Sequence, residues 1–460
     1  MTNALAEDFE RIRSINPTTG AVVYDGPAAT ARDIGQAVGR ARMAQTDWAR
    51  TPVTDRAFIL RRFAELVERD SALLVDLIVA EMGKRRVEAE GEVAWTADSA
   101  RWYAAHPPST DRKGTALVRR IPLGVIAVVT PWNVPLHTPA WKWLPALMAG
   151  NTVVWKPSEL TPAVADAAAR LLAEAGLPPG VLELVIGGRA SGRTLIEDER
   201  IAGVHFTGST ATGRAIAATV APRLIPCALE LGGLNAVLVF DDADIDHAAD
   251  CIIAAGTSIN GQKCTATRRV LAHTSVADPL VDALADRISG LQVGDPAEPD
   301  TDLGPLVTPR AVAAARDAVD SAQQRGARIT ASSTVGDRGE FFPATLLGEV
   351  PQGDPLGSHE LFAPVISLER FSTDDEAWVR ANAGPYGLSA AVHTRDRNRI
   401  ASAPDRLATG VVGVNRRGDA VEQEPPFGGL GASGNGYPEG GEFVYSSLTS
   451  LQACYGQELP

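Results

Sequence analysis

The chain contains few cysteines, four among 460 residues. They are Cys227, Cys251, Cys264 and Cys454. Their spacing leaves no Cys-x-x-Cys pair and nothing typical of a zinc knuckle, so we expect no metal site. The simplest interpretation is that the four thiols are reduced and intracellular.

The chain also lacks a cluster of Lys and Arg, and its formal net charge is -13. This charge repels nucleic acid and anionic lipid, so we expect neither as a partner. The first residues contain no basic region followed by an apolar core, which predicts no secretory signal. The longest strongly apolar stretch, at residues 123–129, is too short to span a bilayer. These absences favour a cytoplasmic protein with no membrane contact.

The composition is that of a folded protein, with 45% hydrophobic and 22% charged residues, and the length predicts two or three domains. The first hundred residues are mostly helical in pattern, at 31–50 and 54–82. From residue 118 strands and helices alternate, which predicts a doubly wound parallel sheet. The expected strands are 118–130 with a turn at Pro122, 152–156, 181–186 and 203–206, and the expected helices are 162–175, 191–197 and 212–220.

After Glu230 the alternation restarts, with segments at 236–240, 246–258, 268–272 and 279–289. This predicts a second α/β domain, which ends at the glycine-dense run 426–436. Both parts of the chain are therefore of the α/β class.

Two residues point to covalent chemistry. Cys264 lies in Gly-Gln-Lys-Cys-Thr, and Glu230 stands 34 residues earlier in Glu-Leu-Gly-Gly. A thiol in a glycine-flanked loop can attack a substrate, and a carboxylate in a glycine-rich turn can move protons. Each residue alone has an ordinary alternative, a small buried hydrophobe for Cys264 and a solvated surface group for Glu230.

Two glycine strings resemble nucleotide-binding motifs. The run 429–434 has the spacing of a dinucleotide fingerprint, but it follows Pro-Pro-Phe and not a strand, so we expect no pyrophosphate there. The run 208–213 has the spacing of a phosphate loop, yet Arg214 and Ala215 replace the Lys-Ser/Thr pair, which excludes a nucleotide-hydrolysing loop. It lies between a strand and a helix, so its backbone N–H groups could face a pyrophosphate.

Seven motifs follow one another along the chain: Thr130-Pro-Trp-Asn133, Lys156-Pro-Ser-Glu159, Phe206-Thr-Gly-Ser209, Glu230-Leu-Gly-Gly233, Gly261-Gln-Lys-Cys264, Glu360-Leu-Phe-Ala-Pro364 and Pro426-Phe-Gly-Gly429. In order and spacing they resemble the NAD(P)-dependent aldehyde dehydrogenase superfamily, with its semialdehyde and aromatic-aldehyde branches as the most similar. The resemblance runs from residue 16 to the final strand.

The resemblance implies an α/β fold in three parts. A Rossmann-type doubly wound NAD-binding domain would span 1–107 and 123–230, and an α/β catalytic domain 231–435. A small β extension at 108–122 and 436–460 would mediate oligomerisation, as a homodimer or homotetramer.

The resemblance also assigns catalytic roles. Cys264 would be the nucleophile that forms a thiohemiacetal and then a thioester, and Glu230 would activate the water that cleaves the thioester. The Asn133 amide and the Cys264 backbone N–H would form the oxyanion hole, and Lys142 would help to relay protons. By themselves, Asn133 could be a turn residue and Lys142 an exposed helix lysine.

For the cofactor, the resemblance implies NAD. Lys156 and Glu159 would hold the adenosine ribose, where a carboxylate repels a 2′-phosphate and so disfavours NADP. Ser209 would lie at the pyrophosphate, and Glu360 with Phe362 at the nicotinamide ribose. The remaining cofactor candidates are Thr130, Trp132, Ser158, Gly188, Gly192, Phe206, Gly208, Leu231 and Gly232.

The substrate would be a small aldehyde. Arg416 and Arg417, with Lys263 and His137, predict a positive patch that binds an anionic group, as in a semialdehyde. The alternative is a neutral or aromatic aldehyde, similar to benzaldehyde or vanillin, packed on Trp141 and Phe427. The substrate candidates, in full, are Val134, His137, Trp141, Lys263, Thr265, Arg416, Arg417 and Phe427.

Two other functions fit the resemblance less well. In a CoA-acylating relative, CoA would resolve the thioester, and Glu230 would then be superfluous as a base for water. A catalytically silent structural homologue would have no need to retain Cys264, Glu230 and Asn133 together.

Overall fold

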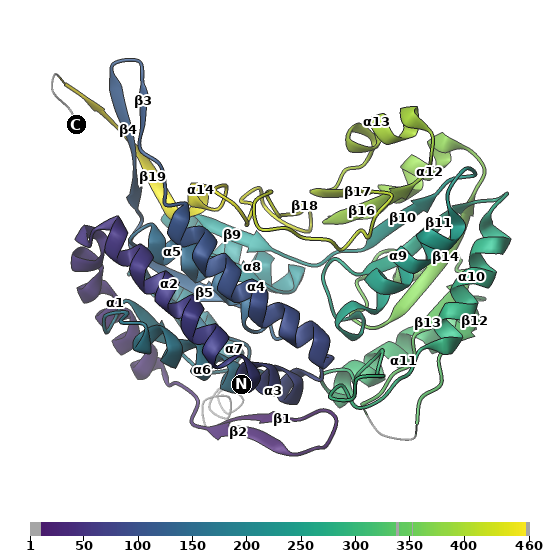
Figure 1. Cartoon of the computed structure of the whole chain (residues 1–460), viewed down its shortest axis with the longest axis horizontal. Helices are drawn as coiled ribbons and strands as arrows, with labels where there is room; N and C mark the ends of the chain where they lie inside the picture. Colours follow the sequence, from purple (N-terminus) through teal and green to yellow (C-terminus); the bar gives the residue numbers. More distant parts are fainter. Residues whose placement is uncertain (1–10, 337–339, 352, 457–460) are drawn as a thin grey trace.

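The computed structural model describes residues 11–336, 340–351 and 353–456. Figure 1 shows two parallel sheets side by side, each covered by helices, and a small sheet that projects from one end. The predicted α/β class is therefore confirmed. No helix within the described residues is both long and apolar enough to cross a bilayer.

The first sheet has five parallel strands in the order β7-β6-β5-β8-β9. Its central strand is a run of Val, Ile and Ala that is almost wholly buried, as is typical of a parallel strand covered on both faces. The chain winds outward from this strand in both directions, so a crevice is expected at the carboxyl ends of β5 and β8. The strands are β5 (Val125–Val129), β6 (Thr152–Lys156), β7 (Leu182–Leu184), β8 (Ile201–Thr207) and β9 (Cys227–Glu230).

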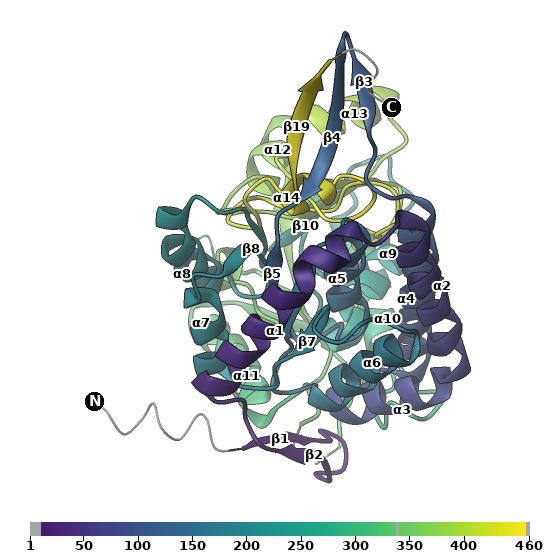
Figure 2. The same ribbon diagram turned by 90° about the vertical axis from the view of Figure 1, so that its left-hand side faces the viewer.

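Helices from two parts of the chain cover the five-stranded sheet (Figure 2). Those that connect its strands are α5 (His137–Met148), α6 (Pro162–Glu174), α7 (Arg189–Glu197) and α8 (Thr210–Val220). Those that precede it are α1 (Ala31–Arg50), α2 (Val53–Arg69), α3 (Ser71–Met82) and α4 (Arg86–Ala105). They bury their apolar faces against the sheet and against one another.

The N-terminal region is mostly helical, as predicted, but two of its details were not predicted. The segment 54–82 is not one helix, because Asp70 ends α2 and begins α3. A β-hairpin of β1 (Ile12–Ile15) and β2 (Val22–Gly26) precedes the helices. Its short strands, half-exposed and separated by a tight turn, carry little of the period-2 pattern that would identify them in the sequence.

The second sheet has seven strands in the order β12-β13-β14-β11-β10-β16-β17, parallel except for the β12–β13 pair. Its strands are β10 (Asn235–Val239), β11 (Thr267–His273), β12 (Arg328–Ser332), β13 (Thr345–Gly348), β14 (Val365–Phe371), β16 (Ser389–His393) and β17 (Val411–Val414). Its helices are α9 (Ile245–Thr257), α10 (Ala277–Gly290), α11 (Pro309–Gln324), α12 (Asp374–Ala381) and α13 (Arg397–Arg406).

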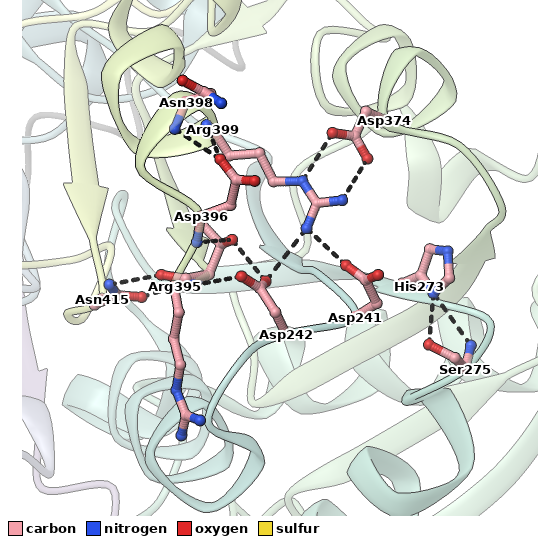
Figure 3. Close-up of polar contacts among 11 residues, drawn as sticks. Asp241, Asp242, His273, Ser275, Asp374, Arg395, Asp396, Asn398, Arg399 and Asn415 are labelled. Carbon is pink, nitrogen blue, oxygen red and sulfur yellow. Dashed lines mark hydrogen bonds and ion pairs between the residues drawn. The ribbon is translucent and has the colours of Figure 1, made fainter.

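The two sheets present opposite ends to the space between them. The carboxyl ends of β5, β8 and β9 lead into Thr130, Gly208 and Glu230, whereas Cys264 precedes the amino end of β11. The carboxyl ends of the seven-stranded sheet carry an ion-pair network instead. There Arg399 of α13 bonds to Asp374, Asp241 and Asp242 at 2.6–3.3 Å (Figure 3).

The projecting sheet joins distant segments in the order β19-β4-β3. Strand β19 (Thr449–Tyr455) pairs antiparallel with β4 (Ala116–Pro122) along its whole length, and β3 (Asp111–Lys113) pairs with the other edge of β4. The segment before β19, including the short helix α14 (Tyr445–Leu448), packs into the body of the molecule. Of the predicted segment 436–460, residues Thr449–Tyr455 pair in the projecting sheet, and the role of the segment in oligomerisation stays a prediction.

Candidate active site

A cavity of about 390 Å³ lies between the two sheets. Cys264, Glu230 and Asn133 all line it, although they come from three separate segments. The five-stranded sheet supplies the segment after β5 and the end of β9, and the seven-stranded sheet supplies the loop before β11. The three residues that the sequence singles out for chemistry thus share one space.

The loop that carries Cys264 begins with a left-handed turn. Ile259, Asn260 and Gly261 have φ values of 53°, 55° and 71°. A Cβ atom at Gly261 would lie 2.3 Å from the backbone nitrogen of Pro364, so only glycine fits there. The turn redirects the chain from α9 towards the cavity and places Cys264 at its wall.

Asn235, at the start of β10, holds the loop from behind. Its Nδ2 donates to the carbonyl oxygens of Cys264 and Ala266, each at 2.8 Å, and its Oδ1 accepts from the Ser389 N–H at 3.1 Å. Asn235 therefore supports the loop that carries Cys264, and nothing in the sequence indicated this contact. It stands in an ordinary strand sequence, and only the parallel pairing of β10 with β11 brings it under the loop.

The partial burial of Cys264 favours its uncharged thiol. Burial raises its pKa to about 12, and the carboxyl groups of Glu360 and Glu230 add to the effect, although Lys263 opposes it. A thiol attacks as its thiolate, so a neighbouring group must take the proton before Cys264 reacts.

Asn133 follows β5 and precedes α5, and its side chain is buried. Its Nδ2 donates to the Gln262 carbonyl oxygen at 3.0 Å. This bond ties the Asn133 amide to the Cys264 loop, two residues before the nucleophile. An amide held beside the thiol is well placed to donate to an oxygen that develops negative charge there.

Glu230 ends β9 and is only 4% exposed. Its Oε2 has no hydrogen-bond partner among the residues that the structure describes. Burial raises the pKa of Glu230 well above its ordinary value, while Lys142 and the Gly429 backbone N–H oppose this shift. A buried carboxyl group with a raised pKa, facing a cavity, is typical of a group that exchanges protons in catalysis.

Lys142 lies on α5 and is fully buried, so the alternative of an exposed helix lysine is wrong. It forms an ion pair with Glu439, which also lines the cavity. Burial lowers the pKa of Lys142, and the nearby Glu230 and Cys264 oppose that shift. The sequence did not identify Glu439 as a partner of Lys142. A carboxylate partner is required only because Lys142 is buried, and its burial is not visible in the sequence.

Seven of the cofactor candidates line the same cavity, namely Trp132, Gly208, Ser209, Leu231, Gly232, Glu360 and Phe362. At two of the glycines, neighbouring side chains approach too closely to leave room for a Cβ atom. A Cβ at Gly232 would lie 2.2 Å from Oε2 of Glu360, and one at Gly208 would lie 2.5 Å from the Phe206 ring. Burial raises the pKa of Glu360 to about 7, and its Oε1 has no partner within the described part of the chain.

These features fit a dinucleotide. Ser209 caps α8 and lines the cavity together with Gly208, so α8 begins at the cavity wall, where a helix N-terminus favours an anion. The carboxyl group of Glu360 offers a free oxygen to a sugar hydroxyl.

The other cofactor candidates lie at the ends of neighbouring elements and do not line this cavity. Thr130 follows β5, Lys156 ends β6, Ser158 and Glu159 follow β6, Phe206 is in β8, and Gly188 and Gly192 are at the start of α7. The Lys156 ammonium donates to Glu159 at 3.3 Å. This pair lies along the same edge of the five-stranded sheet as Ser209, as a long ligand laid across that edge would need.

Six of the substrate candidates line the cavity, namely Val134, His137, Trp141, Lys263, Thr265 and Phe427. Trp95 of α4 joins them, although the sequence analysis did not single it out. Its ring stacks on His137 at 3.9 Å, and Trp141 lies 5.9 Å from Phe427. One wall of the cavity is therefore aromatic.

The predicted positive patch is not assembled in this cavity. Arg416 bonds to Glu422 at 3.2 Å and lies outside the cavity lining. Arg417 is held by Asp419 at 2.8 Å and lines a neighbouring cavity of about 790 Å³. Burial lowers the pKa of His137 to about 3, so its ring is neutral. The sequence could not reveal these partners, because each is brought near by folding.

Lys263 is the member of that patch that reaches both cavities. Its ammonium donates to the Asp419 carboxylate at 2.8 Å, and Asp419 is shared with Arg417. Two cations share this one buried carboxylate, and the Arg417 side chain remains 43% exposed. Among the described residues, no group of three or more His, Cys, Asp or Glu side chains could hold a metal ion.

Comparison with known proteins agrees with this geometry. The chain matches the model of the Aldehyde dehydrogenase family over residues 5–454. It is 36% identical over 434 residues to a succinate-semialdehyde dehydrogenase of Paenarthrobacter nicotinovorans, which covers 92% of this chain and 96% of that protein. It is 35% identical over 466 residues to a probable NADP(+) succinate-semialdehyde dehydrogenase of Sinorhizobium fredii, with 98% and 94% covered.

A solved structure gives the same result for the fold. The NAD+ complex of an aldehyde dehydrogenase from Bacillus cereus matches with a TM-score of 0.93 at 30% identity, over 97% of this chain and 93% of that one. The resemblance inferred from the seven motifs is confirmed. The chain belongs to the aldehyde dehydrogenase family and is an oxidoreductase that acts on an aldehyde with NAD or NADP.

Proposed function

We propose that the protein oxidises a small aldehyde with an anionic group, such as a semialdehyde, to the carboxylic acid with NAD. The observation that carries the reaction is that Cys264, Glu230 and Asn133 line one cavity. The observation that carries the substrate is Lys263, which lines this cavity beside the nucleophile and bonds through its ammonium to Asp419. The relatives named as succinate-semialdehyde dehydrogenases support the same class.

The first step is attack by the Cys264 sulfur on the aldehyde carbon, which forms a thiohemiacetal. Because burial keeps the thiol protonated, Glu230 takes its proton as the bond forms. The oxygen of the adduct becomes negative and receives hydrogen bonds from the Asn133 amide and the Cys264 backbone N–H. Removing one such donor typically costs about a hundredfold or more in rate.

The second step converts the adduct into a product. The cofactor supplies a hydride acceptor when bound. Loss of hydride from the adduct carbon leaves a thioester on Cys264. Glu230 first gives up the thiol proton and then removes a proton from the water that cleaves the thioester. Lys142, whose charge acts on Glu230, and its ion-pair partner Glu439 would carry both protons away from the buried carboxylate.

The preference for NAD rests on Glu159. Its carboxylate, beside the Lys156 ammonium, would accept hydrogen bonds from a ribose diol and repel a 2′-phosphate. Because a similar protein is named for NADP, both cofactors belong in the assay.

A neutral aromatic aldehyde is the second candidate substrate. It is favoured by the aromatic wall of Trp95, Trp141 and Phe427, against which a ring would pack. A CoA-acylating activity is less well supported, because the buried Glu230 would then have no water to activate.

A spectrophotometric screen tests the proposal. Semialdehydes, phosphonate-bearing aldehydes, benzaldehydes and simple alkanals are offered with NAD and with NADP, and reduced cofactor is measured, with Cys264→Ala as the inactive control. We expect the highest kcat/KM for an anionic aldehyde with NAD. A clear preference for benzaldehydes would overturn the substrate class, and activity in Cys264→Ala would overturn the covalent mechanism.

We also propose that the protein is a homodimer or homotetramer in the cytoplasm. The projecting sheet exposes Leu451 and Tyr455, at 66% and 76%, as an interface strand would before assembly. Light scattering coupled to gel filtration measures the mass. A monomer at micromolar concentration would contradict the proposal.

A further inference from the structure

We propose that helix α4 positions the two halves of the oxyanion site, with Glu88 holding the turn before Cys264 and Glu92 holding the start of α5 after Asn133. The inference rests on the proposed function, because it concerns the spacing of the same two donors. Neither carboxylate belongs to a motif that the sequence analysis used.

Glu88 holds the left-handed turn. Its Oε1 accepts from the Ile259 backbone N–H at 2.9 Å, and its Oε2 lies 3.3 Å from Nε of Arg85. Ile259 has a φ of 53°, which a β-branched residue rarely adopts without support from its surroundings. The bond to Glu88 provides such support, from a helix that lies outside the seven-stranded sheet.

The next residue of the turn is held from both sides. The Asn260 Nδ2 donates to the carbonyl oxygens of Gly83 and Pro305, at 2.7 and 3.0 Å, and its Oδ1 accepts from the Gly304 N–H at 2.8 Å. Gly83 lies three residues before the start of α4, so the same part of the chain contacts two consecutive residues of the turn. The turn therefore follows any movement of α4.

Glu92 holds the start of α5, which follows Asn133. It is buried, and its Oε1 accepts from the backbone N–H groups of Leu136 and His137 at 2.8 and 3.1 Å. These are the first free N–H groups of α5, three residues after Asn133. The other oxygen of Glu92 bonds to the buried Lys84 ammonium, which compensates its charge.

The two carboxylates stand four residues apart, so they project from one face of α4, a single turn apart. The segments that they hold meet where the Asn133 amide donates to the Gln262 carbonyl at 3.0 Å. α4 itself packs against α2 and α5. A rigid helix thus sets the distance between the Asn133 amide and the Cys264 backbone N–H, and an error of about 1 Å in such a distance can cost about a hundredfold in rate.

Substitutions at Glu88 test the first half. Glu88→Ala removes the acceptor for the Ile259 N–H, whereas the amide oxygen of Glu88→Gln retains it. The matched control is Glu90→Ala, an exposed glutamate on the same helix. We expect kcat to fall about tenfold or more in Glu88→Ala, with KM for NAD within twofold, and to recover in Glu88→Gln.

A pair of double variants tests the second half. In Glu92→Gln/Lys84→Met the glutamine amide oxygen can still accept from the N–H groups at the start of α5. In Glu92→Leu/Lys84→Met the side chain has no acceptor. Lys84 is replaced in both variants, so neither leaves a buried lysine without a partner. We expect the Leu version to lose kcat about tenfold relative to the Gln version. Thermal unfolding of each variant shows whether the fold is retained.

The outcomes separate this inference from the proposed function. If the parent protein oxidises no aldehyde with either cofactor, the proposed function fails. Suppose that the parent is active, that Glu88→Ala turns over as fast as its control Glu90→Ala, and that Glu92→Leu/Lys84→Met turns over as fast as Glu92→Gln/Lys84→Met. The positioning role of α4 is then overturned. Loss of activity with equal loss in Glu88→Gln would also overturn it, because the acceptor would then not be the cause.

Discussion

Replacing Asn235 with alanine should slow catalysis although Asn235 does not line the cavity. Its side chain makes three hydrogen bonds, two to the carbonyl oxygens of Cys264 and Ala266 and one from the Ser389 N–H. Each typical hydrogen bond contributes about 1 kcal/mol, so we expect about 3 kcal/mol of local stability to be lost, mostly in the loop that carries the nucleophile.

The catalytic effect follows from the direction of the Cys264 peptide. With its carbonyl no longer held, the peptide can rotate and turn its N–H away from the oxyanion. Loss of one oxyanion donor costs roughly a hundredfold or more in kcat, so partial misalignment in Asn235→Ala should cost about tenfold or more. The assay is steady-state reduction of the cofactor with saturating aldehyde.

Asn151 is a matched control. It is fully buried, and its side chain also makes three hydrogen bonds, to Ala146 O and Leu448 O and from the Gly124 N–H. Asn151→Ala should lower the thermal stability by a similar amount, because two carbonyl oxygens and one N–H group again lose their hydrogen-bond partner. It should leave kcat within about twofold. Equal kcat in the two variants would refute the role of Asn235, since instability alone would then explain both.

Three further results are expected. Because burial raises the pKa of Glu230, its active carboxylate is depleted at low pH, and kcat should rise as pH increases through that raised pKa. Glu230→Gln should slow thiol deprotonation as well as thioester hydrolysis, so rapid-mixing absorbance should show both a slower first turnover and a slower steady state. Lys142→Met should destabilise the protein by about 3–5 kcal/mol because Glu439 is left as a buried unpaired charge; adding Glu439→Gln should restore the melting temperature but not kcat. Lys263→Met should raise KM for anionic aldehydes about tenfold and leave neutral aldehydes unchanged, and an equal effect on both would argue against a charge contact.

The reaction class could be predicted because its signals are local. Strand β6 was expected at the residues where it occurs, and the glycine turns around Cys264 and Glu230 are visible as short motifs. The helix break at Asp70 could not be predicted. The helical periodicity of the sequence continues across Asp70, and only the structure shows that α2 ends and α3 begins there.

The substrate residues were harder to predict because charge depends on partners. Arg416 and Arg417 look like a free pair in the sequence, but Glu422 and Asp419 bind them in the fold. His137 looks like a possible cation, but burial makes it neutral.

The sequence by itself determined the α/β class, the family and the residue types that carry the chemistry, because apolar periodicity, turn residues and motifs act over a few neighbouring positions. Only the tertiary structure decided which groups support that chemistry. It brought Glu439 to Lys142, Asn235 to the Cys264 loop and Glu88 to Ile259, across separations of 297, 29 and 171 residues. A buried charge or a strained turn is stable only with its partner in contact, and folding brings these partners together from separate parts of the chain.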